Sequence, residues 1–111
     1  MKDLFNIRGK VALVTGGSRG IGYMIAQGFV ENGARVYISS RKAEACDAAA
    51  QRLSAFGECI SIPMDLSSEQ GAVALADAIK AREDRLDILV NNAGATWGAP
   101  IEEFSTAGWD R

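Results

Sequence analysis

Histidine is absent from the 111 residues, and cysteine occurs only as Cys46 and Cys59. The lack of imidazole excludes every catalytic triad that relies on a histidine base. Two cysteines without a second pair also exclude the ligand spacing of a zinc site. Because a free cysteine behaves as a small apolar residue, we expect both thiols in the core.

A strong charge of either sign is also missing, since 12 basic and 14 acidic residues leave a formal net charge of −2. Such a balance gives no electrostatic footprint for nucleic acid or an anionic membrane. No apolar run approaches the roughly 20 residues of a membrane span, and the opening segment MKDLFNIRGK has no apolar signal-peptide core. We therefore expect a soluble, cytoplasmic protein with neither nucleic acid nor membrane as partner.

Four short runs of β-branched residues or leucine begin near Val11, Arg35, Cys59 and Asp87, and each is followed by a helical pattern. Strands that alternate with helices indicate βαβ units and a parallel sheet. We therefore expect a single domain over residues 1–111 with an α/β fold. It should be a doubly wound, Rossmann-type parallel sheet with helices on both faces.

The strand patterns predict where each strand lies in the sheet. Residues 11–14 and 88–90 are continuously apolar, as is typical of parallel strands covered on both faces, whereas residues 59–64 alternate and include Pro63, as an edge strand can. Right-handed crossovers and the strand order 3-2-1-4 satisfy these patterns.

Three helices are expected between the strands. The first covers residues 20–32 and ends at Gly33, the second covers residues 42–56, and the third opens at Ser67 with Gln70 as the partner in a capping box. The residues expected to face the core are Ile21, Met24, Ile25 and Phe29 in the first helix, Cys46, Ala49, Ala50, Leu53 and Phe56 in the second, and Ala72, Leu75, Ala76 and Ile79 in the third.

The fourth strand has no outer neighbour in this order, although its sequence is typical of a central strand. Exposed apolar edges invite pairing and aggregation, and natural folds usually cover them. After Gly94 the sequence predicts a helix that begins near Ser105 or Thr106 and stops before two turns. We therefore expect a truncated sheet that continues in a longer chain or pairs with another one.

The segment TGGSRGIG, residues 15–22, follows the first apolar run and opens the first helix. Unpaired amides and the helix dipole at such a place attract an anion, typically the pyrophosphate of a dinucleotide. Gly16 would allow the turn, Gly20 the close approach of the cofactor, and Gly22 the packing of the helix against the sheet. A purely structural turn with surplus glycines is the alternative.

The glycine spacing G-x-x-x-G-x-G resembles the T-G-x-x-x-G-x-G signature of the short-chain dehydrogenase/reductase family. Residues 91–94, Asn-Asn-Ala-Gly, match the family's N-N-A-G segment after the fourth strand, and Asp65-Leu66 match its adenine-contacting position. The resemblance extends over essentially the whole chain. It implies cofactor contacts from Gly16, Ser18, Arg19, Gly20, Ile21, Gly22, Asp65, Leu66, Asn92, Ala93 and Gly94.

The end of the second strand predicts which cofactor binds. An acidic residue there would bond the 2′-hydroxyl of NAD, but this sequence has Ser40 and Arg41, which offer a hydroxyl and a planar fork of donors to a phosphate. In the family's geometry Arg19 would form the other side of the clamp. We therefore expect NADP(H), although Arg41 and Lys42 could also be only a solvated helix start.

The residues that catalyse hydride transfer in this family, a Tyr-x-x-x-Lys pair with an upstream Ser and an Asn, have no match in this chain. Gln27 stands four residues after Tyr23, and Arg41 stands four residues after Tyr37. Both tyrosines are better explained as packing residues. We therefore predict the cofactor-binding half of a longer enzyme, with no catalytic residue and no metal ligand, and with no activity in the 111-residue chain alone.

Within the family, the sequence is most similar to bacterial 3-oxoacyl-(acyl carrier protein) reductases, including those that feed rhamnolipid precursors, and to gluconate 5-dehydrogenases. This implies reduction of a small-molecule carbonyl or acyl-thioester substrate by a homodimer or homotetramer. A non-catalytic dinucleotide-binding module or pseudoenzyme remains an alternative. An S-adenosylmethionine methyltransferase is disfavoured, because Ser40 and Arg41 stand where that class has an acid.

Overall fold

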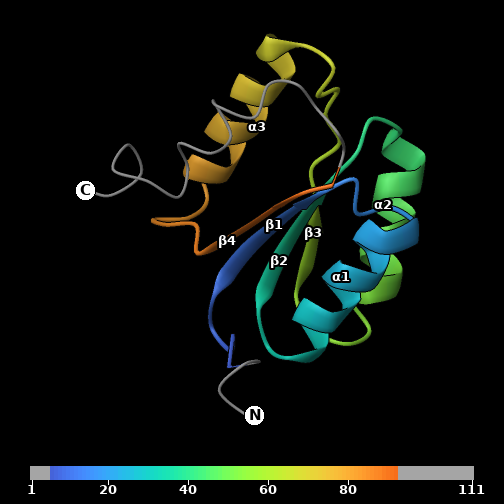
Figure 1. The fold of residues 1–111 in the computed structure, drawn as a ribbon, viewed down its shortest axis with the longest axis vertical. Coiled ribbons are helices and arrows are strands. Elements are labelled where there is room, and N and C mark those ends of the chain that lie inside the picture. Colours follow the sequence, from blue (N-terminus) through green and yellow to red (C-terminus); the bar gives the residue numbers. More distant parts are fainter. Residues whose placement is uncertain (1–5, 93–111) are drawn as a thin grey trace.

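The structure, a computed structural model, describes residues 6–92 and shows a parallel sheet between two layers of helices (Figure 1). The strands are β1 (Val11–Thr15), β2 (Arg35–Ser39), β3 (Cys59–Ser61) and β4 (Ile88–Asn91), and the helices are α1 (Gly20–Glu31), α2 (Ala43–Leu53) and α3 (Glu69–Lys80). The strand order is β3-β2-β1-β4, which confirms the predicted doubly wound topology. The helix expected near Ser105 lies outside the described residues.

The two faces of the sheet carry separate apolar cores. Helices α1 and α2 cover one face and α3 covers the other (Figure 1). Successive side chains of a strand point to opposite faces, so Ala12 and Val14 pack toward α1 and α2, whereas Leu13 packs toward α3. All five residues of β1 are buried, as expected for a central strand.

Helices α2 and α3 bury the positions that their hydrophobic periodicity predicts. The confirmed core positions are Cys46, Ala49, Ala50 and Leu53 in α2, and Ala72, Leu75, Ala76 and Ile79 in α3. Both cysteines are free and buried, which confirms their expected place in the core. The sequence therefore specifies how these two helices face the sheet.

The predicted inner face of α1 is wrong in part. Ile21 is 68% exposed and Met24 is 70% exposed, while the helix buries Gly22, Ala26 and Val30. At Gly22 the helix lies so close to the turn after β1 that even a Cβ would overlap the carbonyl oxygen of Gly16, so no large side chain fits there. Ile25 and Phe29, which were also expected to face the core, are partly buried and pack against it.

The predicted helix ends also need correction. Helix α2 stops at Leu53, so Phe56 lies beyond it and is 51% exposed rather than in the core. Ser68 caps α3, not Ser67, because the Ser68 hydroxyl accepts the Gly71 N–H at 3.1 Å. At the end of α1, Gly33 has the left-handed φ of 91° expected of a stop residue.

The two outer strands of the described sheet are β3 and β4. The position of β3 confirms the edge predicted for residues 59–64. Within residues 6–92, β4 pairs only with β1, and Ile88, Leu89 and Val90 are all half-buried. Over the same residues, none of the helices has both the length and the apolar character to span a bilayer, and no group of acidic or cysteine side chains could hold a metal ion.

Candidate functional site

The segment that joins β1 to α1, residues 16–22, is called the glycine turn here. Gly16 and Gly20 have φ values of 70° and 65°, in the left-handed region that favours glycine. Arg19 occupies the N-cap position without a side-chain hydrogen bond to the helix, and the first turn of α1 contains no acidic residue. The first amides of α1 and the positive end of its dipole are therefore available to an anion.

Two glycines of the turn have different steric surroundings. A Cβ on Gly22 would overlap the carbonyl oxygen of Gly16 and lie 2.7 Å from Nδ2 of Asn92. A Cβ on Gly20 would meet nothing within 4 Å. Gly22 thus lets α1 approach the turn and the segment after β4, whereas the space beside Gly20 is open.

Thr15 links the glycine turn to the segment after β4. Its buried hydroxyl accepts the N–H of Asn92 at 2.9 Å and donates to Oδ1 of Asn91 at 3.0 Å. Neither Thr15 nor Gly17 had a role that could be assigned from the sequence alone. A Cβ on Gly17 would lie 2.8 Å from Cγ2 of Ile38. Thr15 holds the turn to the segment after β4, and Gly17 lets the turn lie against Ile38 of β2. Because these contacts join residues far apart in the sequence, only the tertiary structure reveals them.

The end of β2 carries two buried hydroxyl groups. The Oγ atoms of Ser39 and Ser40 are shielded from solvent and have no hydrogen-bond partner within the described part of the chain. Buried polar atoms are nearly always hydrogen-bonded, so these two oxygens call for a partner beyond residues 6–92, such as a ligand or a water molecule. Arg41 follows directly and is exposed, and no acidic residue lies between β2 and Arg41.

The segment after β3 lies beside the end of β2, because the N–H of Met64 donates to the carbonyl of Ser40 at 3.0 Å. Asp65 follows, and its Oδ1 accepts the Ser67 hydroxyl at 2.6 Å and the Ser67 N–H at 3.0 Å. These bonds hold the pKa of the Asp65 carboxyl below its ordinary value, and the Arg41 guanidinium lowers it further. Asp65 is therefore an ionised hydrogen-bond acceptor whose charge is stabilised by Arg41.

The predicted site residues within the described chain all lie beyond the carboxyl ends of the parallel strands, the usual place for ligands in such sheets. Ile21 is exposed, but Leu66 is a core residue at 6% exposure, so its contribution to a ligand site would come from its backbone. Of the other expected contacts, Ala93 and Gly94 lie outside the described residues. The residues brought to this edge are Gly16, Ser18, Arg19, Gly20, Ile21, Gly22, Ser40, Arg41, Asp65, Leu66 and Asn92.

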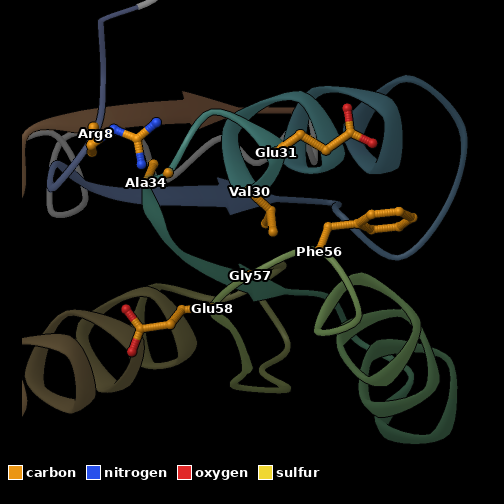
Figure 2. Close-up of a pocket in the computed structure, with 8 residues that line it drawn as sticks. Arg8, Val30, Glu31, Ala34, Phe56, Gly57 and Glu58 are labelled. Carbon is orange, nitrogen blue, oxygen red and sulfur yellow. The ribbon is translucent and has the colours of Figure 1, made fainter.

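An open pocket of about 320 Å³ lies at the opposite edge of the sheet (Figure 2). Its lining includes Arg8, Val30 and Phe56, together with the short segments that lead into β2 and β3. Figure 2 shows that the carboxylates of Glu31 and Glu58 point away from each other. Because its polar groups do not converge, this pocket is a weaker site than the edge that holds the glycine turn.

A family model described as short chain dehydrogenase matches residues 10–111. The chain belongs to the short-chain dehydrogenase family. This membership confirms the resemblance carried by the glycine turn and the Asn-Asn-Ala-Gly segment. Proteins of this family bind nicotinamide dinucleotides.

Two relatives in this family are similar to the chain over almost all of its length. A rhamnolipids biosynthesis 3-oxoacyl-[acyl-carrier-protein] reductase of Pseudomonas aeruginosa is 59% identical over 111 residues, which is 100% of this chain and 43% of the relative. A gluconate 5-dehydrogenase of Gluconobacter oxydans is 40% identical over 109 residues, which is 97% of this chain and 43% of the relative. The chain thus spans less than half the length of either one.

A solved structure of a short-chain dehydrogenase has the same fold. The Pseudomonas aeruginosa RhlG/NADP active-site complex superposes with a TM-score of 0.81 at 58% sequence identity, covering 94% of this chain and 42% of that one. That complex shows NADP bound to a similar protein.

Proposed function

We propose that this chain binds NADP(H) at the carboxyl edge of its sheet and forms the cofactor-binding half of a carbonyl reductase. The observation that carries the proposal is the pair of buried, unpartnered serine hydroxyls at the end of β2, beside Arg41 and opposite an uncapped glycine turn. The residues that would hold the cofactor are Gly16, Ser18, Arg19, Gly20, Ile21, Gly22, Ser40, Arg41, Asp65, Leu66, Asn92, Ala93 and Gly94.

The residues present fit two parts of such a cofactor, the pyrophosphate and the adenine. The glycine turn offers free amides and an open space at Gly20 to the pyrophosphate. Asp65 offers an ionised acceptor to the adenine. Once bound, the nicotinamide would supply or accept the hydride, while the protein's residues orient it.

Selectivity for the 2′-phosphate would come from Arg41, Ser40 and Arg19. A guanidinium can bond a phosphate through two parallel donors, and the hydroxyl of Ser40 has no competing partner within residues 6–92. Arg41 lies just before α2 and its side chain is exposed, so its guanidinium can reach a ligand at this edge of the sheet. This placement supports NADP(H) over NAD(H).

The proposal predicts that Arg41→Ala weakens NADPH binding selectively. Loss of a charged hydrogen bond to the phosphate costs about 1.5 to 3 kcal/mol, so the Kd for NADPH should rise roughly tenfold to a hundredfold, while the Kd for NADH should change little. The measurement is a fluorescence or calorimetric titration of the purified chain with each nucleotide.

Lys42→Ala is the matched control, because Lys42 is the next residue, carries the same charge and makes no side-chain cap to α2. It should leave both Kd values within about twofold, since the charge of an exposed side chain that does not contact the ligand is screened by water and salt. Equal losses of NADPH and NADH affinity in Arg41→Ala, or equal effects of the two variants, would contradict a direct contact with the 2′-phosphate.

The substrate class follows from the relatives by analogy. The 59% identical relative is a 3-oxoacyl-[acyl-carrier-protein] reductase, so a 3-oxoacyl thioester is the carbonyl substrate we propose for the protein that contains this half. Neither Tyr23 nor Tyr37 begins a Tyr-x-x-x-Lys pair, so the proton transfer would depend on residues other than these 111. We propose that the parent assembles as a homodimer or homotetramer.

A further inference from the structure

Gly71, in the first turn of α3, lies against the segment that follows β3. A Cβ on Gly71 would overlap the carbonyl oxygen of Asp65 and lie 2.8 Å from its carbonyl carbon. The conflict is with backbone rather than with the end of a flexible side chain, so it could not be relieved without moving Asp65. Alanine therefore cannot replace Gly71 while Asp65 keeps its place.

The backbone conformation of Gly71 does not itself call for glycine. Its φ is not positive, unlike that of Gly16 or Gly20, and glycine is among the least favourable residues inside a helix. The close approach of Asp65 is what the glycine permits. Gly28 in α1 provides a contrast, since a Cβ there would meet nothing within 4 Å.

The approach fixes a short turn between two anchored points. On one side, the Met64 N–H bonds the carbonyl of Ser40 at the end of β2. On the other, the Ser68 hydroxyl accepts the N–H of Gly71 at 3.1 Å. Between them Ser67 donates twice to the Asp65 carboxylate, which fixes the carboxylate within this turn.

We propose that Gly71 is a positioning residue that sets how the protein distinguishes adenine from other purines. The inference rests on the proposed function, in which Asp65 faces the adenine. A carboxylate accepts a hydrogen bond from the 6-amino group of adenine, whereas hypoxanthine has a carbonyl at that position and repels it. By admitting the Asp65 carbonyl against α3, Gly71 keeps this acceptor in register with the base.

The test compares NADPH with its hypoxanthine analogue, deamino-NADPH, on three forms of the full chain. The native chain should bind NADPH about tenfold more tightly than the analogue, as one hydrogen bond to a charged group allows. Gly71→Ala should bring this ratio close to one. Gly28→Ala, the matched control in another helix, should keep the native ratio.

The ratio separates positioning from general damage, because a loss of stability weakens both ligands equally and leaves their ratio unchanged. A folded Gly71→Ala protein with the native ratio would overturn the inference, as would a native chain that binds both nucleotides equally. If the native chain binds NADPH and neither variant changes the ratio of the two Kd values, only the role of Gly71 is refuted. If the native chain does not bind NADPH at all, the proposed function is refuted as well.

Ser68→Ala is the second variant, for use if Gly71→Ala does not fold. It removes the acceptor that holds the Gly71 N–H, without adding atoms at the contact. The ratio of the Kd for deamino-NADPH to the Kd for NADPH should fall to about half its native value, a smaller change than in Gly71→Ala but of the same sign. A native ratio in folded Ser68→Ala protein would then overturn the inference.

Discussion

The hydroxyl groups at the ends of β1 and β2 have opposite surroundings. Thr15 is fully buried with partners in the segment after β4, whereas Ser39 and Ser40 have buried oxygens without a partner in residues 6–92. Both arrangements depend on strand register, which places Thr15 beside Ser39 on one side and Asn91 on the other. Sequence motifs could indicate Ser40, but the burial of Ser39 depends on this pairing.

Tyr37 confirms at the residue scale that the tyrosines serve packing. Its side chain is fully buried, and its hydroxyl donates to Oε2 of Glu83 at 2.5 Å, while the same oxygen pairs with Arg35 at 3.0 Å. Burial, reinforced by the Glu83 carboxylate, raises the pKa of the Tyr37 phenol to about 12. The folded chain therefore keeps this proton at pH values where an unfolded chain releases it.

Stability should consequently fall as the pH rises from 10 toward 12. Below the ordinary phenol pKa of 10.0 the Tyr37 phenol is protonated in both the folded and the unfolded chain, so its contribution to stability is fully present. Between pH 10 and 12 the phenol ionises only in the unfolded chain, which favours unfolding. Tyr37→Phe should flatten this decline, and it should lower stability at neutral pH by about 1 kcal/mol through the lost hydrogen bond. Urea unfolding at a series of pH values measures both effects.

Burial also raises the pKa of the Cys59 thiol to about 12. The native chain and Tyr37→Phe both contain Cys59, so its titration affects the two stability curves equally. An equally steep alkaline decline in Tyr37→Phe would show that Tyr37 is not its source.

At the scale of the element, hydrophobic periodicity predicted two helices well and one poorly. Helices α2 and α3 turn their apolar positions to the sheet, so the pattern sufficed. Helix α1 instead presents Gly22, Ala26 and Val30, because its N-terminus touches the turn it grows from. Hydrophobic periodicity counts large apolar residues, so it predicted Ile21 and Met24 as core positions, but both are exposed.

The correction at the start of α3 leads to a prediction about its cap. Ser68→Ala removes the acceptor of the Gly71 N–H and should lower the free energy of unfolding by about 1 kcal/mol. Ser67→Ala is the neighbouring control, since the Ser67 hydroxyl donates to Asp65 at 2.6 Å instead of capping the helix. Urea unfolding of both variants should show the larger loss in Ser68→Ala; the reverse order would restore Ser67 as the cap.

At the scale of the whole molecule, the fold was predictable because composition, strand pattern and motif order all indicate the same α/β topology. The strand order, the edge position of β3 and the buried cysteines agree with the structure. The details of the site were less predictable, since the unpartnered hydroxyls and the tight contact at Gly71 arise from segments far apart in sequence.

We propose that this chain binds the cofactor and that residues outside it transfer the proton, which predicts NADPH binding without NADPH oxidation. A polypeptide of these 111 residues should bind NADPH, yet it should not oxidise it in the presence of a ketone or a 3-oxoacyl thioester, because it has no Tyr-x-x-x-Lys pair to transfer the proton. Absorbance of the reduced nicotinamide over time measures the rate. A steady, enzyme-dependent decline would contradict the assignment of catalysis to other residues.

The hydrogen bond from Asn92 to Thr15 also determines when the ligand edge is complete. It joins residues 77 positions apart, so the glycine turn leaves the ribosome well before the strand that closes its far side. Closing so long a loop has an entropic cost that nearer contacts avoid. A nascent chain can therefore present the turn early, but the edge of the sheet beside it is complete only after β4 has been synthesised and has paired with β1.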